Sequence, residues 1–404
     1  MISNQGDTFE LLSRRAYGTP TNADLLKQAN PGLIEPLPAG VEVVTPQSPN
    51  TPANRSQSNS EDGFTLVLDG GKFVYWNEVA VTRTIDSPPS VEIATVWEPK
   101  HEELRRAFKP FSFVPTEVYI GKDKLFTGTM LTPTPQCRRD ESTLTASAYG
   151  RTGALLDCTS PGSAFGLDFN DQKLDQIAAK ILQPFGVTAV FQSPPGEVFE
   201  QFSVNPSDRV LPLLAKLAKQ RGLIISETPD GDLLFTTGEP PARPSAVLSD
   251  QASPVEEVRA AFSPQEYYSH ITVIAPTLVG LLGEQVTARN PHLTQPLRPY
   301  VFEAEDSQNQ TLQQIADTKL GRMFANMVSW QCRVVGWRKE DGALWTPGET
   351  IKLHAPTAMI YKPTILLVRG VTLEQTDDSQ TATLELILPT AFAGRIPESM
   401  PWDE

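Results

Sequence analysis

Cysteine and histidine are scarce in this sequence, and their scarcity excludes several kinds of site. The three cysteines, Cys137, Cys158 and Cys332, are far apart and form no CxxC pair. Neither a disulfide framework nor a zinc site is therefore indicated, and we expect reduced, partly buried thiols. The four histidines show no HExxH or similar metal-binding spacing, and we expect each in a loop or at the surface: His101, His270, His292 and His354.

Positive charge and long apolar runs are also missing. Lysine and arginine number 34 against 48 aspartates and glutamates, which gives a net charge of −14. A surface that grips nucleic-acid phosphates needs clustered Lys and Arg, so this balance argues against such a function. No apolar run approaches the ~18 residues of a membrane span. We therefore expect synthesis in the cytoplasm, with no secretion signal and no membrane anchor.

Motifs for catalysis are absent as well. The sequence has no Gly-x-Ser-x-Gly elbow and no Walker-type phosphate loop. Acidic residues are plentiful, but many pairs fit a glycosidase equally well, so none is singled out. We predict that the chain is not an enzyme, with no catalytic, cofactor-binding or metal-binding residues and no cofactor.

Proline, by contrast, is abundant. The 36 prolines and 26 glycines lie mainly between short apolar runs, a pattern typical of many turns and short strands. With 404 residues, of which 39% are hydrophobic, the chain is long enough for two to four domains.

The N-terminal stretch is the exception to this β pattern. Asp7 and Thr8 can cap a helix, a second short helix is expected from Asn22 to Ala29, and a VEVV run leads to Pro46. We assign residues 1–46 to a small module with the order strand, two helices, strand. Residues 47–62 contain almost no large apolar side chain and are predicted to be a flexible linker.

Residues 4–46 resemble the LysM module. The features that carry the resemblance are the Gly-Asp-Thr opening, the Tyr-Gly after the first helix, the Asn-Pro after the second and the closing proline: Gly6, Asp7, Thr8, Tyr17, Gly18, Asn30, Pro31 and Pro46. LysM modules commonly bind N-acetylglucosamine polymers, and in phage tails they also serve as structural parts. The resemblance places a ligand groove at Tyr17, Gly18, Asn30 and Pro31, for either sugar binding or docking of another protein.

The remaining chain divides into two β regions around a mixed unit. Alternating segments over 63–157 predict a small barrel or sandwich, and amphipathic helices with an Asp-Gly hairpin predict an α+β domain over 158–244. A second β region over 245–389 contains one helix and includes the segment YYSHITVIA among its strands; residues 390–404 form a tail. Trp337 and Trp345 either pack a hairpin end against the second β region or contribute to an interface.

The order of these segments resembles the baseplate hub proteins of contractile-tailed phages, of the phage Mu hub and late control protein D type. The resemblance is carried by LVLDGGKFVYWNEVAVTRTID, EVYIGKDKLFTGTM, LTASAYGRTGALLDC, FSVNPSDRVLPLLAKLAKQRGLIISETPDGDLLFT and GWRKEDGALWTPGETIKL. It implies a mainly β fold with two tail-tube-like barrels in one chain, joined by the smaller α+β domain and preceded by the LysM module.

The resemblance also implies a function. Three chains would form a homotrimeric ring with pseudo-sixfold symmetry in the tail baseplate of a virion assembled in the host cytoplasm. The ring would join the hexameric tail tube, or a tube-initiator protein, to the trimeric central spike. DNA would pass without specific binding, and the LysM module would contact baseplate wedge or sheath-initiator proteins. The alternative is a LysM-targeted protein that binds or degrades peptidoglycan. Phage tails, tailocins and injection systems are not distinguished by the sequence.

Overall fold

The computed structural model describes residues 3, 5–17, 23–45, 63–137, 142–161, 168–275, 283–304, 311–376, 379–389 and 394–403.

The first β region is an antiparallel arrangement with one short helix. Apolar and polar residues alternate along its strands, so one face of each strand is buried. In the turn between the first two strands, Asp69 and Gly70 lie in the left-handed backbone region. Its elements are β1 Phe64–Leu68, β2 Gly71–Phe73, β3 Glu78–Thr84, β4 Ser90–Val96, α4 Glu102–Ala107, β5 Pro115–Ile120, β6 Asp123–Cys137 and β7 Ser142–Gly150.

The second β region uses a similar set of strands from the C-terminal half. It also carries the predicted helix, which begins with a capping box made by Thr311 and Gln314. Its elements are β13 Ala246–Ser249, β14 Val255–Phe262, α8 Leu312–Met327, β18 Val328–Val335, β19 Thr350–Ala355, β20 Ile360–Gln375 and β21 Gln380–Ile387.

The two regions have the same strand order. The first runs β3-β4-β7-β6-β5-β1, and the second runs β14-β18-β21-β20-β19-β13. In both, the fourth strand is long, at 15 residues in β6 and 16 in β20. Each long strand also carries a register shift against its neighbour, between Met130 and Thr132 and between Val368 and Gly370. The two β regions therefore repeat one strand order, and they differ in direction only at the last strand, where β1 runs antiparallel to β5 and β13 runs parallel to β19.

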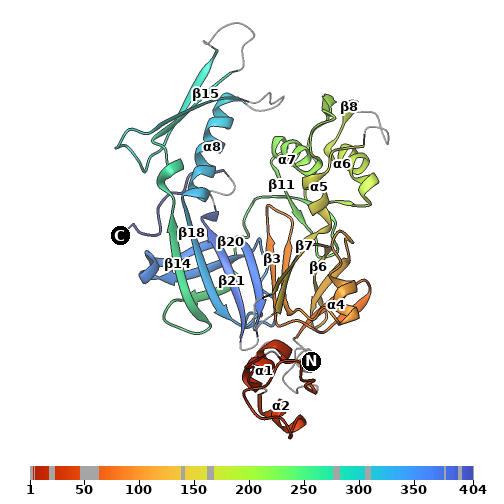
Figure 1. The fold of residues 1–404 in the computed structure, drawn as a ribbon. Coiled ribbons are helices and arrows are strands. Elements are labelled where there is room, and N and C mark those ends of the chain that lie inside the picture. Colours follow the sequence, from red (N-terminus) through yellow and green to blue (C-terminus); the bar gives the residue numbers. More distant parts are fainter. Residues whose placement is uncertain are drawn as a thin grey trace.

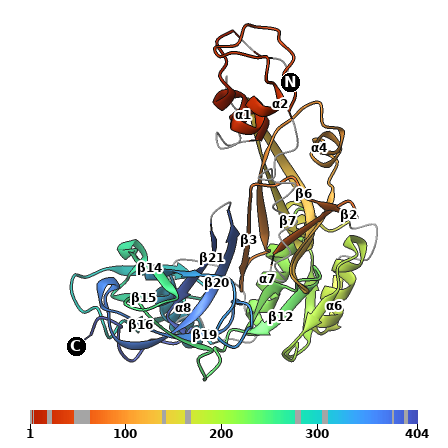
Figure 2. The same ribbon diagram turned by 90° about the horizontal axis from the view of Figure 1, so that it is seen from below.

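A single 13-stranded sheet contains both regions, because β20 pairs with β3. Figure 1 shows this sheet running from β14 on one side to β6 and α4 on the other, and Figure 2 shows that its two halves meet at an angle. The sheet encloses one continuous hydrophobic core with Phe126, Trp330 and Phe324 among its largest members. The mainly β fold class is thus confirmed.

The α+β unit between the two regions has a core of its own, in which Phe235, Leu214 and Ile177 are fully buried. The predicted amphipathic helices are confirmed as α6 and α7, and the hairpin with Gly231 at its turn as β11–β12. Its elements are α5 Ala154–Asp157, β8 Asp168–Gln172, α6 Leu174–Leu182, β9 Ala189–Phe191, β10 Phe199–Ser203, α7 Val210–Gln220, β11 Leu223–Glu227 and β12 Leu233–Thr237.

One strand predicted from the sequence is confirmed as a strand but does not join the expected sheet. The segment YYSHITVIA forms β15, which lies outside the large sheet in a three-stranded sheet of its own. The reason is packing, since the buried face of β15, Ile271 and Val273, is part of the core beside α8. Alternation along a strand reports a buried face but does not say which sheet the strand joins. The elements of this sheet are β15 His270–Ile274, β16 Gln285–Arg289 and β17 Pro299–Glu303.

The N-terminal module consists of α1 Phe9–Tyr17 and α2 Ala23–Ala29 around a small core that includes Phe9, Leu12 and Leu26. In the described residues, the strands expected at its ends are reduced to single bridges, such as Asp7 with Leu37.

Candidate assembly surfaces

The junction between β20 and β3 is where the two β regions meet. Six residue pairs form an antiparallel ladder, from Gly370 opposite Thr84 to Gln375 opposite Val79. On one face, the hydroxyl groups of Thr82 and Thr372 are hydrogen-bonded at 3.0 Å. The junction is therefore an ordinary piece of sheet, although its two strands lie far apart in the sequence.

Charged side chains strengthen the same junction. Arg369 on β20 contacts Asp86, just beyond β3, with Nη2 to Oδ2 at 2.8 Å, and contacts Glu385 on β21 with Nη1 to Oε1 at 3.4 Å. These charge-assisted contacts raise the pKa of Arg369 against the opposing effect of burial.

Trp337 supplies the aromatic part of the junction. Its ring lies edge-on to Phe64 of the first region, with ring centroids 4.8 Å apart, and its Nε1 donates to the carbonyl of Glu374 at 3.0 Å. The next residue, Arg338, pairs with Asp123 at the start of β6, with Nη2 to Oδ2 at 3.0 Å. Trp337 and Trp345 are both buried, as expected for packing against the β regions, and a contribution to an interface with another chain stays a prediction.

Two strands of the large sheet have open backbone edges in the described part of the chain. At one end of the sheet, β14 pairs only with β18. Within the first β region, β5 pairs with β6 only as far as Thr129, so residues 132–137 of β6 have β7 on one side and no described strand on the other. Open edges are sites at which another strand can add.

On one face of the large sheet, the strands on both sides of the β20–β3 junction carry polar side chains. Glu78, Glu92 and Glu374 alternate along their strands with buried apolar residues, and threonines and serines fill many of the positions between them. A hollow of about 320 Å³ on this face is lined by Glu78, Glu92 and hydroxyl side chains of β6 and β7. Partial burial, and then the nearby charges of Glu374 and Glu92, raise the pKa of Glu78.

The α+β unit is fastened to the first β region by Glu227, the last residue of β11. Its carboxylate accepts hydrogen bonds from Arg151 N at 3.1 Å, from Thr152 N at 3.0 Å and from the Thr152 hydroxyl. Burial raises the pKa of Glu227 to about 7, although these hydrogen bonds and the charge of Arg83 act in the opposite direction. A Cβ atom at Gly150 would lie 2.3 Å from Glu227 Oε1, so only glycine leaves room for the carboxylate.

The predicted LysM groove is only partly described. Tyr17 ends α1, but its side chain and Gly18 lie outside the described residues. Asn30 is buried: Nδ2 donates to the carbonyls of Leu26 and Val44, and Oδ1 accepts from Val44 N, each at 2.8 Å. Pro31 is exposed. The Asn30 amide thus holds the last segment of the module against α2 and is not offered to a ligand.

The cysteines and histidines lie in different environments. Cys137 and Cys158 are exposed rather than partly buried, whereas Cys332 is buried and burial raises its pKa to about 12. His101 packs against Tyr75, and His292 Nε2 lies 2.7 Å from the Pro397 carbonyl. Within the described ranges, no group of three His, Cys, Asp or Glu side chains could hold a metal ion, and no helix has the length and hydrophobicity to span a bilayer.

These features define a class of fold, in which two β regions of one strand order share a single sheet within one chain. Residues 152–237 match the family model described as "Baseplate hub protein gp44-like, second domain". The chain is homologous to the baseplate hub protein gp44 of Escherichia phage Mu, with 26% identity over 347 residues, which cover 80% of this chain and 87% of that protein. The predicted resemblance to Mu-type baseplate hubs is confirmed.

Solved structures show the same fold. The 43 kDa tail protein of prophage MuSo2 from Shewanella oneidensis superposes with a TM-score of 0.69 at 21% identity, covering 82% of this chain and 99% of that one. A tail protein from Neisseria meningitidis MC58 superposes with a TM-score of 0.67 at 18% identity, covering 83% of this chain and all (100%) of that one.

The sequence did not identify the polar face or the β20–β3 junction as functional features. A sequence pattern indicates the polar face, because Glu78, Ala80 and Thr82 alternate with Val79 and Val81. No sequence pattern indicates the junction, because its paired positions are about 290 residues apart.

Proposed function

We propose that this protein is the structural hub of a contractile-tail baseplate, and that three copies form a ring joining the tail tube to the central spike. The observation that carries the proposal is the repeated topology of the two β regions and the junction between them. Two repeats in each of three chains give six similar units, which suits a contact with hexameric tube rings on one side and a trimeric spike on the other.

The internal junction provides a template for the contact between chains. Within the chain, the end of β20 pairs with β3, the first strand of the other repeat. The equivalent contact joins the end of β6 to β14 of the next chain, and both are open edges in the described structure. Each repeat contributes four strands in alternating directions, so this new contact is antiparallel like the internal one.

The equivalence of the two repeats also predicts which residues of β6 lie opposite which residues of β14 in the next chain. The shifts in β6 and β20 align Thr132 with Gly370, and the strand pairings align Arg259 with Ala80. Since Glu374 lies opposite Ala80 in the chain, Gln136 of one copy is expected opposite Arg259 of the next.

Two prolines reduce the number of hydrogen bonds that the open edge of β6 can make. Pro133 and Pro135 lie on the open part of β6. Proline in a paired strand points its nitrogen toward the open side, which leaves acceptors but no donors at these two positions. The edge is therefore a poor template for indiscriminate strand addition.

The polar face of the sheet is proposed as the channel wall. Carboxylates and small hydroxyl side chains repel or only weakly hold phosphates, so DNA can slide past without specific binding. No hydrolytic activity is expected, because the proposed role is to hold tube, spike and baseplate parts together in the virion.

Cysteine pairs test the ring directly. In a background with Cys137 and Cys158 changed to Ser, Gln136→Cys with Arg259→Cys is expected to give disulfide-linked trimers on oxidation. Glu374→Cys with Ala80→Cys is the positive control, because its bond forms within one chain. Gln136→Cys with Val258→Cys places the thiols on opposite faces and is expected not to link. A wild-type protein that stays monomeric by light scattering at all concentrations contradicts the ring.

For the N-terminal module, a docking role toward wedge or sheath-initiator proteins is proposed in preference to sugar binding. The support is the LysM pattern around Tyr17, Gly18, Asn30 and Pro31, together with the polar segment 47–62 that separates it from the β regions. Such a tether allows a reach of about 20 Å. Deleting residues 1–61 is expected to leave the trimer intact and to impair attachment of surrounding baseplate proteins. Tight binding of N-acetylglucosamine oligomers by the intact module would overturn this role.

A further inference from the structure

One edge of β20 is shared end to end by two strands. Its first half pairs with β19, and its second half pairs with β3. Just before β19, Gly348 N donates to the Val368 carbonyl at 2.8 Å, and just after β3, Ile85 N donates to the Arg369 carbonyl at 3.0 Å. The start of β19 and the end of β3 therefore abut on neighbouring residues of β20.

The segment before β19 covers the end of β3. A Cβ atom at Gly348 would lie 3.6 Å from Ile85 Cγ2, and Ile85 is only 8% exposed. Residues 346–349 and 83–85 also line one hollow of about 500 Å³. The junction inside the chain thus includes a place where the segment before one strand packs on the end of another.

The first β region has the same arrangement with one strand missing. Along residues 132–137 of β6, no described strand takes the place that β3 takes on β20. The bulges in β6 and β20, with the pairings of β5 and β19, make Pro115 equivalent to Thr350. Residues 111–113, just before β5, are therefore equivalent to residues 346–348, just before β19.

Hydrogen bonding and backbone conformation support this equivalence. The Val114 carbonyl before β5 accepts from β6 at 2.9 Å, as the Glu349 carbonyl before β19 accepts from β20 at 2.8 Å. The backbone φ is positive at both Phe113, with 49°, and Gly348, with 89°. A positive φ suits glycine and is unfavourable for a bulky side chain, so the phenylalanine is kept here against local strain.

The strand equivalent to β3 is β14. The pairings that align Arg259 with Ala80 also align Phe262 with Arg83 and Pro264 with Ile85. When β14 of the next chain pairs with the open part of β6, as in the proposed ring, its end therefore abuts the segment before β5.

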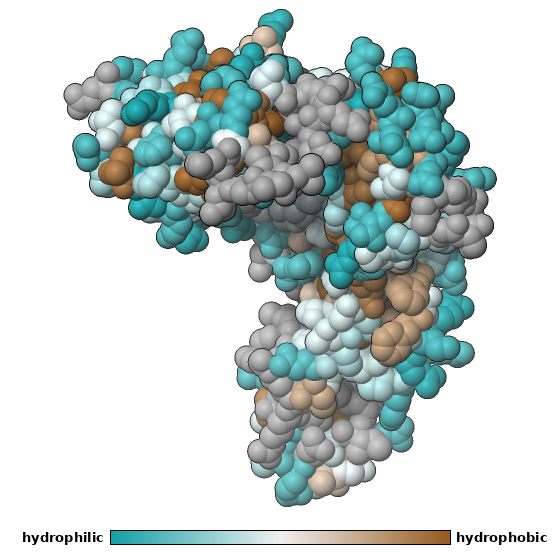
Figure 3. Space-filling model, turned by 90° about the horizontal axis from the view of Figure 1, so that it is seen from above, coloured by the Kyte–Doolittle hydropathy of each residue, from teal (hydrophilic) through white to brown (hydrophobic). Residues whose placement is uncertain are grey.

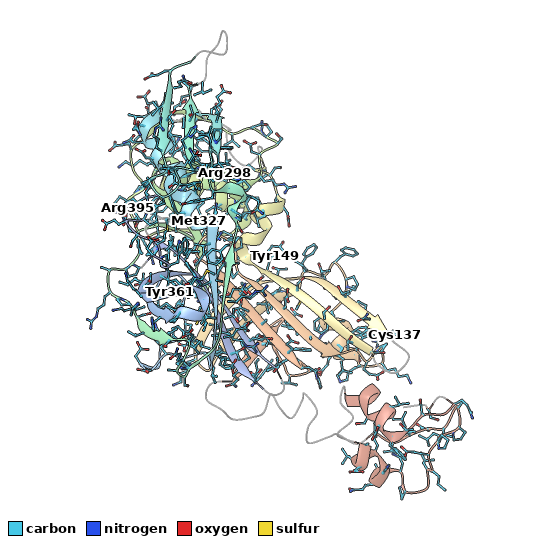
Figure 4. The ribbon with its side chains drawn as sticks, turned by 90° about the vertical axis from the view of Figure 1, so that its left-hand side faces the viewer. Cys137, Tyr149, Arg298, Met327, Tyr361 and Arg395 are labelled. Atoms are coloured by element: carbon cyan, nitrogen blue, oxygen red, sulfur yellow. The ribbon has the colours of Figure 1, made fainter. Side chains whose placement is uncertain are left out.

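The two surfaces cannot meet within one chain. In the sheet order, β18, β21, β20, β3, β4 and β7 lie between β14 and β6. Arg298 holds the residues after β14, because its Nη2 donates to the carbonyls of Pro264 and Gln265, each at 2.9 Å. Figure 4 shows Arg298 far from Cys137 at the end of β6. The strand that covers residues 111–113 must therefore come from another copy.

Exposed apolar side chains lie at both places. Phe111 is 89% exposed, Phe113 57% and Phe262 45%, and Pro264 is exposed as well. In the junction inside the chain, none of the equivalent positions is aromatic, and the apolar residue there, Ile85, is buried. Aromatic rings left in water at two matching strand ends are typical of surfaces that a partner covers.

We infer that Phe111 and Phe113 of one chain pack on Phe262 and Pro264 of the next chain, where β14 of that chain ends against β5. The inference rests on the proposed ring and adds the side chains that hold each contact together. It is the counterpart, between chains, of the Gly348–Ile85 contact.

The apolar contact compensates for missing hydrogen bonds. The bond from Ile85 N to the Arg369 carbonyl has no counterpart between chains, because Pro264 has no N–H group. Pro133 and Pro135 likewise offer no donors along the open part of β6. Association therefore depends more on burial of apolar side chains at this strand end than the junction inside the chain does.

The test replaces Phe111 and Phe113 with glycine in the full chain. Glycine accepts a positive φ, so the unfolding temperature of the monomer is expected to change little. The dissociation constant of the trimer, measured by sedimentation equilibrium, is expected to rise at least about a hundredfold. Tyr361→Ala, at an aromatic residue that is 48% exposed and lies outside this contact, is the matched control and is expected to leave the trimer unchanged.

A double-mutant cycle tests whether the two surfaces touch. Phe262→Ala is expected to weaken the trimer as well. Added to the glycine variant, it is expected to have much less effect than alone, because its contact is already lost. Fully additive losses would mean that the two surfaces do not touch, and would overturn the inference.

A cysteine pair tests the same contact directly. In the Ser background used for the ring, Phe113→Cys with Pro264→Cys is expected to give disulfide-linked trimers on oxidation. Phe113→Cys with Val335→Cys is the matched control and is expected not to link, because Val335 lies beside the opposite end of β14.

The outcomes separate this inference from the ring itself. Formation of the Gln136–Arg259 cysteine link without the Phe113–Pro264 link would overturn the inference and leave the ring standing. Unweakened trimers of the glycine variant would do the same. A monomeric wild type would overturn both.

Discussion

The carboxylate of Glu227 leads to a prediction about pH. It is 5% exposed and joins β11 of the α+β unit to residues 151–152 of the first β region. Changing it to Gln removes the titrating group and keeps the size of the side chain. The structure thus predicts how the docking of the α+β unit depends on pH.

The magnitude follows from the pKa. Burial raises the pKa of Glu227 from 4.5 to about 7, a difference worth about 3 kcal/mol. Because the folded pKa lies above the unfolded one, the folded state binds the proton more tightly. The stabilisation by the protonated form is complete below pH 4.5 and is lost as the pH rises through about 7. Docking is therefore expected to weaken from acid toward neutral pH and to stay constant above it.

Hydrogen exchange measured by mass spectrometry reports this directly, because peptides from α6 and α7 give the opening free energy of the unit. In the wild type, this free energy is expected to fall by most of about 3 kcal/mol between pH 5 and pH 8. In Glu227→Gln it is expected to be flat over the same range. Glu200→Gln, at an exposed position on β10, is the matched control and keeps the wild-type slope.

Two results would refute this reasoning. A wild-type opening free energy that rises with pH would mean that the hydrogen bonds from Arg151 and Thr152, with Arg83, outweigh burial. Equal slopes in the wild type and Glu227→Gln would mean that another group sets the pH dependence.

Three further substitutions test close contacts. Gly150→Ala places Cβ 2.3 Å from Glu227 Oε1 and is expected to cost about 3 kcal/mol in the same exchange measurement; an unchanged value contradicts the tight fit. Gly321→Ala in α8 places Cβ 2.1 Å from the backbone of Gly394, so trypsin is expected to cleave the C-terminal segment faster, and equal cleavage rates would contradict this. Asn30→Ala removes three hydrogen bonds in the module, which is expected to lower its free energy of unfolding by about 2 to 3 kcal/mol. Residues 1–46 with this change are expected to lose cooperative melting, measured by circular dichroism. Pro31→Ala, at an exposed position, serves as the control.

Figure 3 gives a view of the molecule from above. Hydrophilic side chains cover most of the visible surface, and hydrophobic ones are exposed in several places. A cleft of about 290 Å³ lies between α7 and β11 on one side and α8 on the other, with Arg322 and Lys219 on its walls. Burial lowers the pKa of Arg322.

Local sequence patterns determined the elements of this protein. The alternation of apolar residues such as Val79 and Val81 with polar ones predicted the strands, since a half-buried strand needs apolar side chains at every second position. The spacing of Leu214 and Leu217 predicted α7, and the Asp-Gly turn predicted the β11–β12 hairpin. The order of these elements was enough to predict a Mu-type hub, because homologous chains keep the sequence of elements even at 26% identity.

Only the tertiary structure decided how the elements are joined. The pairing of β20 with β3, the separate sheet of β15 and the exposure of Phe111 and Phe113 depend on contacts between residues far apart in the chain. A strand carries the same alternation whether its neighbour is 10 or 290 residues away, so its sequence does not name the partner. Likewise FKPFSF contains one buried and two exposed phenylalanines, and only the packed structure separates Phe108 from the other two, because burial depends on what the rest of the fold places against each ring.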